Sequence, residues 1–117
     1  MKKNLQIHML TSQGNVEYNL LGEYDVERNI IHYVDSDEQT QMTLDLNHHK
    51  LIRENDNLRI ECLFLEKETT TQKILLKENK QILEVPIQTK QFMVDNQEIK
   101  IEYVVDNQDI IIYEIKM

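Results

Sequence analysis

Side chains that could act as nucleophiles are scarce in this chain. Nucleophilic catalysis requires a Ser, Cys or Thr held beside a base that a third group orients. The two serines, Ser12 and Ser36, fall in expected turns and lack a G-x-S-x-G context. Cys62 alternates with apolar residues, which is typical of a small buried hydrophobe. The sequence therefore assigns no catalytic residue, and an enzyme would need a constellation that only the fold assembles.

Metal-ligating residues show no spacing that favours a metal site. His48 and His49 are adjacent, and neighbouring side chains of a strand point to opposite faces, so the two could share an ion only in a turn. DSDE at 35–38 resembles the start of a calcium loop but lacks the glycine and the distal glutamate. We expect a solvated turn and a charged hairpin tip. With only two glycines there is no phosphate-binding loop, and no metal or cofactor is predicted.

The aromatic residues that could contact a ligand are mainly tyrosines, at positions 18, 24, 33, 103 and 113. Nucleic-acid modules of the OB type place aromatics inside a basic groove, whereas lysines and arginines here are spread singly among acids. The alternative is a core position with the hydroxyl at the rim. We expect Tyr18, Tyr103 and Tyr113 to point inward and to provide polar groups beside an apolar wall.

The elements that position these side chains follow a strand pattern along the whole chain. VDNQEI at 94–99 recurs as VDNQDI at 105–110, and alternating apolar residues follow each copy. Similar short runs begin near residues 5, 16, 30, 42, 51, 58, 73 and 81, with polar breaks between them. No window repeats apolar residues at helical spacing. Asparagines at 15, 29, 47, 57, 79, 96 and 107 are expected to take the place of glycine in the turns.

The length, the cysteine content and the net charge indicate a small single-domain protein. A chain of 117 residues is one domain, 1–117, by the usual size prior. A single cysteine excludes an internal disulfide, the N-terminal segment is too interrupted for a signal peptide, and no apolar run could span a membrane; we expect a cytoplasmic protein. The net charge of −8 disfavours nucleic acid and anionic membrane surfaces as partners.

Short strands joined by short loops predict an antiparallel meander. Closure removes unpaired edges, so the fold class expected is all-β, a single antiparallel up-and-down barrel of about 8–10 strands with little or no helix. A two-sheet sandwich is the alternative. Gly22 is expected to bend its strand, and Pro86 to mark an edge or a bulge.

Several landmarks carry a resemblance to a known family. They are Gly22 followed by Tyr24, the run TQMTLDLNHHKLIREND at 40–56, VPIQ at 85–88 and the closing DIIIYEIKM. On these the chain resembles the calycin-like β-barrel proteins known as the domain of unknown function 1934 family, found mainly in Gram-positive bacteria. At VPIQ only the proline matches the family's Thr-Pro-aromatic-Gly step. The resemblance implies a barrel related to lipocalins and streptavidin, and it implies no activity or catalytic residue.

Two functions are expected from these features. The first is a non-enzymatic barrel that binds a small apolar or amphipathic ligand at its mouth, with Tyr18, Tyr103 and Tyr113 in the site. The alternative is a protein-interaction module, such as a homodimer, that uses an outward strand face. Ile110 and Ile112 are expected to face outward and to join Leu63 and Leu65 in one apolar patch.

Overall fold

The computed structural model describes all residues, 1–117, and consists of ten antiparallel strands without a helix. Each strand pairs with its neighbours in sequence, and β1 pairs with β10 to close the barrel. The predicted all-β, up-and-down barrel is confirmed, with the strand count at the upper end of the expected range. No segment of the chain is a helix with the length and apolar character needed to cross a membrane. The strands are β1 (Lys2–Thr11), β2 (Gly14–Asp25), β3 (Ile30–Val34), β4 (Gln41–Asp45), β5 (Lys50–Glu54), β6 (Leu58–Leu63), β7 (Thr69–Leu76), β8 (Gln81–Asp95), β9 (Glu98–Val105) and β10 (Asp109–Lys116).

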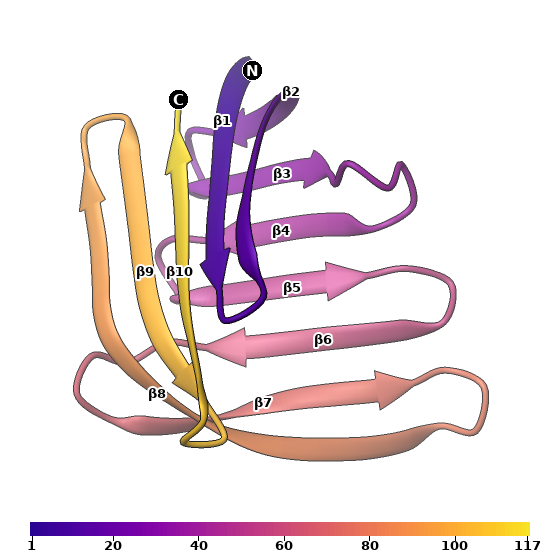
Figure 1. The fold of residues 1–117 in the computed structure, drawn as a ribbon. Coiled ribbons are helices and arrows are strands. Elements are labelled where there is room, and N and C mark those ends of the chain that lie inside the picture. Colours follow the sequence, from indigo (N-terminus) through magenta and orange to yellow (C-terminus); the bar gives the residue numbers. More distant parts are fainter.

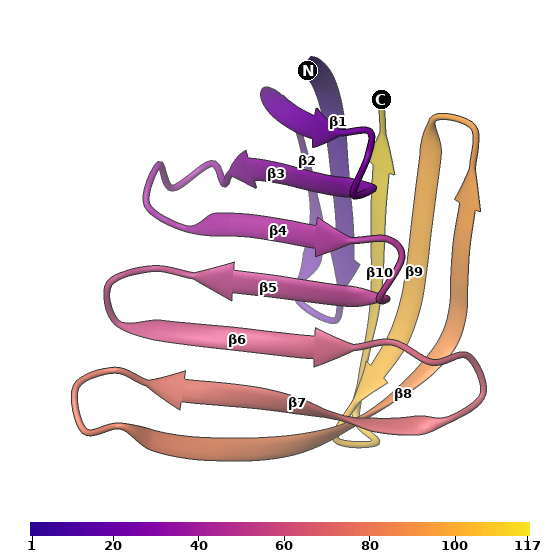
Figure 2. The same cartoon turned by 180° about the vertical axis from the view of Figure 1, so that it is seen from behind.

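The barrel consists of two layers whose strands cross at a steep angle (Figure 1). In this view β1, β9, β10 and most of β2 run upright, whereas β3 to β7 run across the molecule. Figure 2, from behind, shows the crossing strands in front of the upright ones. β8 belongs to both layers, because its first part pairs with β7 and its last part with β9. The core lies between the layers, where each strand contributes its inward set of alternate residues.

Two long strands turn the corners between the layers, and each has a local reason to bend. In β2 the buried Gly22 lies where the strand crosses β3; a Cβ there would come within 2.5 Å of Leu5 Cδ1. In β8 the register shifts between Thr89 and Gln91, which is a β-bulge. Bulges and glycines let a strand bend sharply while it stays paired. The predicted bend at Gly22 is confirmed, and the second bend lies beyond the run predicted for this strand.

Pro86 lies at the boundary between the part of β8 that pairs on one side only and the part that pairs on both sides. Gln81 to Pro86 pair with β7 only, and pairing with β9 begins at Ile87. The carbonyl of Pro86 accepts a hydrogen bond from the backbone N–H of Asp106 at 2.8 Å, so the missing N–H of Pro86 faces the same side, where β9 ends. The predicted edge position is confirmed, and the bulge is a separate feature further along the strand.

The tight turns depend on residues in the left-handed region of φ. Asparagine adopts this conformation at positions 29, 96 and 107, with φ of 59°, 44° and 58°. Asn15, Asn47, Asn57 and Asn79 do not, so the predicted substitution of asparagine for glycine is correct at only some turns. The other positive-φ positions are occupied by Gly14, with φ of 131°, and by Glu38, His49, Lys67, Lys80 and Asp106. Side chains without a turn preference therefore adopt a conformation that costs them free energy.

Candidate functional site

The two ends of the barrel differ in how they are closed. At the end that carries the chain termini, Phe64 and Phe92 fill the interior, and the His49 ring stacks on Phe92 with centroids 4.2 Å apart. The His49 Nδ1 also lies 3.1 Å from the Phe64 carbonyl oxygen. These aromatic rings plug the interior, so the end is closed to a ligand.

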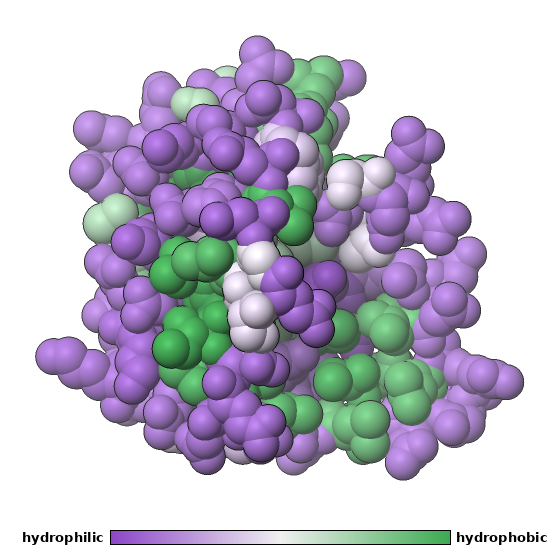
Figure 3. Space-filling view, in the orientation of Figure 1, coloured by the Kyte–Doolittle hydropathy of each residue, from purple (hydrophilic) through white to green (hydrophobic).

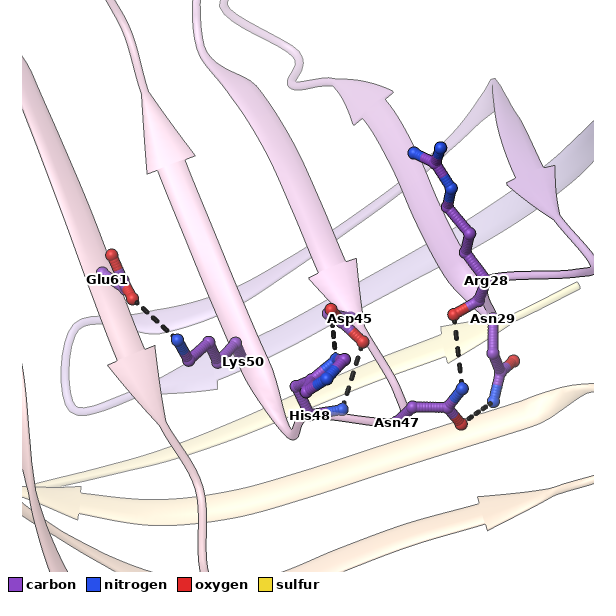
Figure 4. Close-up of polar contacts among 7 residues, drawn as sticks. All are labelled: Arg28, Asn29, Asp45, Asn47, His48, Lys50 and Glu61. Atoms are coloured by element: carbon purple, nitrogen blue, oxygen red, sulfur yellow. Dashed lines mark hydrogen bonds and ion pairs between the residues drawn. The ribbon is translucent and has the colours of Figure 1, made fainter.

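Polar contacts fix the turns at this closed end (Figure 4). The Asn29 amide donates to Asn47 Oδ1 at 3.1 Å, which joins the β2–β3 turn to the β4–β5 turn. His48 Nδ1 lies 2.8 Å from Asp45 Oδ2 within the β4–β5 turn. These contacts use the polar side chains of the turns locally. No three His, Cys, Asp or Glu side chains lie close enough together to hold a metal ion.

At the opposite end the upright and the crossing layers diverge. Pairing between β2 and β3 is confined to Glu23–Asp25 and Ile30–His32, so most of β2 has β1 as its only neighbour. The turns β1–β2, β3–β4, β5–β6, β7–β8 and β9–β10 all lie at this end. Inward side chains there are partly exposed, such as Val16 at 54%. We call this end the mouth.

The structure distributes the three tyrosines of the expected site between the core and the mouth. Tyr113 is fully buried and Tyr103 is 6% exposed, so both are part of the packed interior. Tyr18 is half-buried at the mouth, and its hydroxyl donates to the Asp35 carboxylate in the β3–β4 turn. This contact links the upright layer to the crossing layer. Of the three, only Tyr18 lies where a ligand at the mouth could reach it without rearrangement of the core.

Tyr33, which sequence reasoning did not select, completes the buried polar group. Its hydroxyl pairs with that of Tyr113 across the interior. Burial raises the pKa of Tyr18, Tyr33, Tyr103 and Tyr113 above the ordinary tyrosine range. The tyrosines are therefore neutral hydrogen-bonding groups at physiological pH. The Tyr33–Tyr113 pair also fills the space between β3 and β10 that an open cavity would need.

Arg53 is the second residue that sequence reasoning missed. It follows Leu51 on the inward face of β5, between Met42 and Ile60 on the neighbouring strands. Its Nε is buried without a hydrogen-bond partner, and the side chain takes part in none of the ion pairs. A guanidinium turned toward the interior without a partner is uncommon, because such a charge is costly to desolvate.

The positive charge of Arg53 affects the pKa values of Cys62 and of three tyrosines. Burial raises the pKa of the Cys62 thiol to about 12, and the positive charge of Arg53 opposes part of that rise. Arg53 likewise opposes the burial-driven rise in the pKa of Tyr18, Tyr33 and Tyr103. The charge of Arg53 also lowers the pKa of Asp37, so its surroundings include an acid at the rim as well as these neutral groups. Cys62 itself is 3% exposed and protonated, as expected for a buried hydrophobe.

Beside Arg53, the inner surface of the crossing layer continues beyond the core as an uncovered apolar face. Its members lie on β6, β7 and β8, point inward by strand alternation, and neither belong to the core cluster nor pack against it. Leu83 is 40% exposed and the others are half-buried. Figure 3 shows apolar side chains over the part of the molecule where Figure 1 draws these strands. We call this surface the mouth face, and it consists of Leu58, Ile74, Leu76, Leu83 and Val85.

A depression of about 470 Å³ adjoins the mouth face at the tips of the β5–β6 and β7–β8 hairpins, with Leu58 and Leu76 in its wall. Another, of about 610 Å³, lies over β1 and β2 and is lined in part by Asn4, Gln6 and Asn19. Both have inward apolar residues in their walls, Leu58 and Leu76 in the first and Leu5 and Leu20 in the second, and only the first adjoins the mouth face. Neither is lined by Tyr103 or Tyr113.

The outward apolar residues do not gather as the sequence predicted. Ile110 and Ile112 lie on β10, whereas Leu63 and the following Leu65 lie at the end of β6, with β7, β8 and β9 between them. The expected single patch is therefore wrong. The residues that do join Ile110 and Ile112 on the outer face are Leu10, opposite Ile112, and Val104, opposite Ile110.

The charged tip at 35–38 has a local structural role. The Asp37 carboxylate accepts hydrogen bonds from the backbone N–H of Gln39 at 2.9 Å and of Thr40 at 2.8 Å. The Thr40 hydroxyl donates to the same carboxylate at 2.5 Å, and this hydrogen bond, followed by the two from the backbone, lowers the pKa of Asp37, so the carboxylate stays ionised. The segment is a charged hairpin turn, as its sequence predicted.

Comparison with known proteins supports the fold alone. No family model and no curated protein matches the chain. Among solved structures, the chain is similar to the crystal structure of the ywiB protein from Bacillus subtilis, with a TM-score of 0.64 and 16% sequence identity. The similarity covers 97% of this chain and 89% of that chain. The two proteins therefore share a β-barrel over nearly their whole length.

Proposed function

We propose that this protein is a non-enzymatic barrel that holds a small amphipathic ligand at its mouth. The observation that carries the proposal is the mouth face, an inward apolar surface that lies outside the packed core and stays half-buried or exposed. A ligand that removes apolar side chains from water lowers the free energy of the complex, by about 1.5–3 kcal/mol for each Leu or Ile that becomes fully buried. The polar groups at its inner end, Tyr18 and Arg53, would fix the orientation of the ligand.

The packed interior limits how deep the ligand would lie. Tyr113 and its buried neighbours already fill the centre of the barrel, so the ligand would rest on the mouth face with Tyr103 and Tyr113 beneath it. A site of this kind is a groove at one end of the barrel and accepts a flat or extended molecule. The absence of any nucleophile beside an oriented base favours binding over catalysis.

The test uses N-phenyl-1-naphthylamine, an uncharged apolar dye whose fluorescence rises in apolar surroundings. We expect the wild-type protein to bind the dye saturably and the Leu83→Asp variant to bind it at least about tenfold more weakly, because a carboxylate on the mouth face opposes an apolar ligand. Ile82→Asp is the matched control: Ile82 is the neighbouring residue, 61% exposed on the outer face. Equal binding by the two variants, or no saturable binding at all, would refute the proposal.

A second candidate function is self-association through the outer face. The outer patch formed by Leu10, Val104, Ile110 and Ile112 spans β1, β10 and β9, and Ile110 is 56% exposed. Figure 3 shows apolar side chains on this front surface as well. Sedimentation velocity up to high protein concentration tests it: a dimer that Ile110→Glu dissociates would support this function, and a strict monomer would exclude it.

The resemblance to the domain of unknown function 1934 family leads to a related proposal about descent. The barrel topology, the bend at Gly22 and the position of Pro86 support a place for this chain near those proteins. Sequences intermediate between this chain and family members test the relation. If Gly22 and Pro86 vary freely among them, the likeness is one of fold only.

A further inference from the structure

We infer that the ligand of the mouth is an amphiphile with a singly charged anionic head group, and that Arg53 binds the head group while the mouth face holds the apolar part. This inference deepens the proposed function and rests on it. It follows from the charge of Arg53, which takes part in no ion pair, and from the register of the strands beside it.

The charge of Arg53 lacks an ion-pair partner within the protein. No carboxylate lies within ion-pair distance of it, and its Nε makes no hydrogen bond. The nearby hydroxyls of Tyr18, Tyr33 and Tyr103 and the thiol of Cys62 stay protonated and cannot neutralise it. Arg53 is half-buried, with its Nε buried, and a charge that is partly removed from water is usually compensated by an anion. An anionic group from outside would provide that compensation.

A continuous apolar surface leads away from Arg53 and could hold the apolar part of a ligand. Arg53 is directly opposite Ile60 on β6, Ile60 is opposite Ile74 on β7, and Ile74 is opposite Leu83 on β8. The row crosses three strand spacings, about 14 Å. An extended chain with its head group at Arg53 would therefore lie across β6 to β8 and cover the mouth face.

The charges at the mouth favour a head group with a single negative charge. One guanidinium offers a planar fork that matches a carboxylate or a similar oxyanion. Asp35 and Asp37 lie in the β3–β4 turn at the rim, and the Asp35 carboxylate accepts the hydrogen bond from the Tyr18 hydroxyl. These two carboxylates, which lie at the rim and form no ion pair with Arg53, repel a doubly charged phosphate more than a singly charged carboxylate. A single negative charge is therefore the best match.

The test measures displacement of N-phenyl-1-naphthylamine from the whole protein by decanoate, decan-1-ol and decyl phosphate, each below its micelle concentration. We expect the wild-type protein to prefer decanoate over decan-1-ol by about tenfold or more, the range of a charge-assisted hydrogen bond. Decyl phosphate should bind no more tightly than decanoate. The Arg53→Met variant keeps an apolar stem without the charge, so it should lose the preference for decanoate over decan-1-ol.

Arg59→Gln is the matched control, because it removes the same charge from the outer face of the neighbouring strand. It should keep the preference for decanoate. If the dye and decan-1-ol bind but decanoate has no advantage, or Arg53→Met keeps that advantage, the anionic head group is refuted and the proposed function stands. A strong preference for decyl phosphate would refute the single charge. If the dye itself does not bind, the proposed function fails and this inference fails with it.

Discussion

At the scale of single residues, the interior of the barrel depends on polar groups that satisfy one another. The hydroxyls of Tyr33 and Tyr113 pair across the core, whereas Arg53 faces the same interior without a partner. A satisfied buried pair stabilises the fold, and an unsatisfied charge is a cost that binding can offset. This contrast separates the structural tyrosines from the residue that we assign to ligand binding.

The Tyr33–Tyr113 pair leads to a stability prediction. Tyr113→Phe leaves the Tyr33 hydroxyl buried without its partner, and we expect the free energy of unfolding to fall by about 1–3 kcal/mol. The double variant with Tyr33→Phe removes both hydroxyls and should be more stable than the single variant. Urea unfolding followed by circular dichroism measures both. A double variant that loses the sum of the two single losses would show that the hydroxyls are not coupled.

The Cys62 thiol leads to a prediction about pH. Its pKa is raised to about 12 in the folded protein by burial, so the folded state holds this proton at pH values where the unfolded chain has released it. Stability from this group is complete below pH about 9 and is lost as the pH rises toward about 12. The buried tyrosines act in the same direction at high pH.

Urea unfolding at pH 7, 9 and 10.5 checks this prediction in the wild-type protein and in Cys62→Ala. The variant lacks the titrating thiol and should lose less stability between pH 9 and 10.5, whatever its stability at pH 7. Parallel losses in the two proteins would mean that the thiol contributes nothing to the pH dependence.

At the scale of elements, the two strands that turn corners determine the shape of the barrel. β2 bends at a glycine and β8 at a bulge, and both link the upright layer to the crossing layer (Figure 1). A side chain at position 22 would meet the His32 carbonyl oxygen at 3.1 Å and Tyr33 Cβ at 3.2 Å. The contact distances leave no room for a methyl group without movement of β3.

Gly22→Ala should therefore destabilise the protein by about 1–3 kcal/mol, the usual cost of overpacking a core. Glu23→Ala, at the exposed neighbouring residue, is the control and should change stability by less than about 0.5 kcal/mol. Thermal unfolding of the two variants measures the difference. Equal stability would mean that the two strands have space to separate at this corner.

The β7–β8 turn leads to the opposite kind of prediction. Lys80 has a φ of 57°, a conformation that glycine adopts without steric cost. Lys80→Gly should raise the free energy of unfolding by up to about 1 kcal/mol, whereas Lys80→Ala keeps a Cβ and should not. A destabilised Lys80→Gly variant would show that the flexibility of glycine in the unfolded chain dominates at this turn.

Alternation along the strands was enough to predict the elements, whereas the site depended on the register. Each apolar run became a strand because its inward residues pack on the core, and the repeated VDNQ segments became turns. Arg53 is two residues after Leu51 in β5, so its side chain lies on the same inward face. This spacing could have identified Arg53 from the sequence, although the segment is short and weakly apolar. The Tyr33–Tyr113 contact joins residues 80 positions apart, so no local pattern could reveal it.

At the scale of the whole molecule, the barrel is closed by hydrogen bonds but unevenly covered. Aromatic side chains plug one end, while at the other the two layers diverge and the mouth face stays exposed. The sequence predicted a barrel and a mouth site, but it did not show which end would be open or how fully the interior would be packed. Both follow from the crossing of the layers, which depends on bends at Gly22 and at residues 89–91.

Native mass spectrometry of the protein purified from its own host shows whether the mouth holds a ligand. Part of the wild-type protein should carry a small acidic molecule, released on unfolding, and Leu83→Asp and Arg53→Met should carry less of it. Ile82→Asp should carry as much as the wild-type protein. A wild-type protein with only the mass of its own chain, indistinguishable from the mouth variants, would contradict a ligand at the mouth.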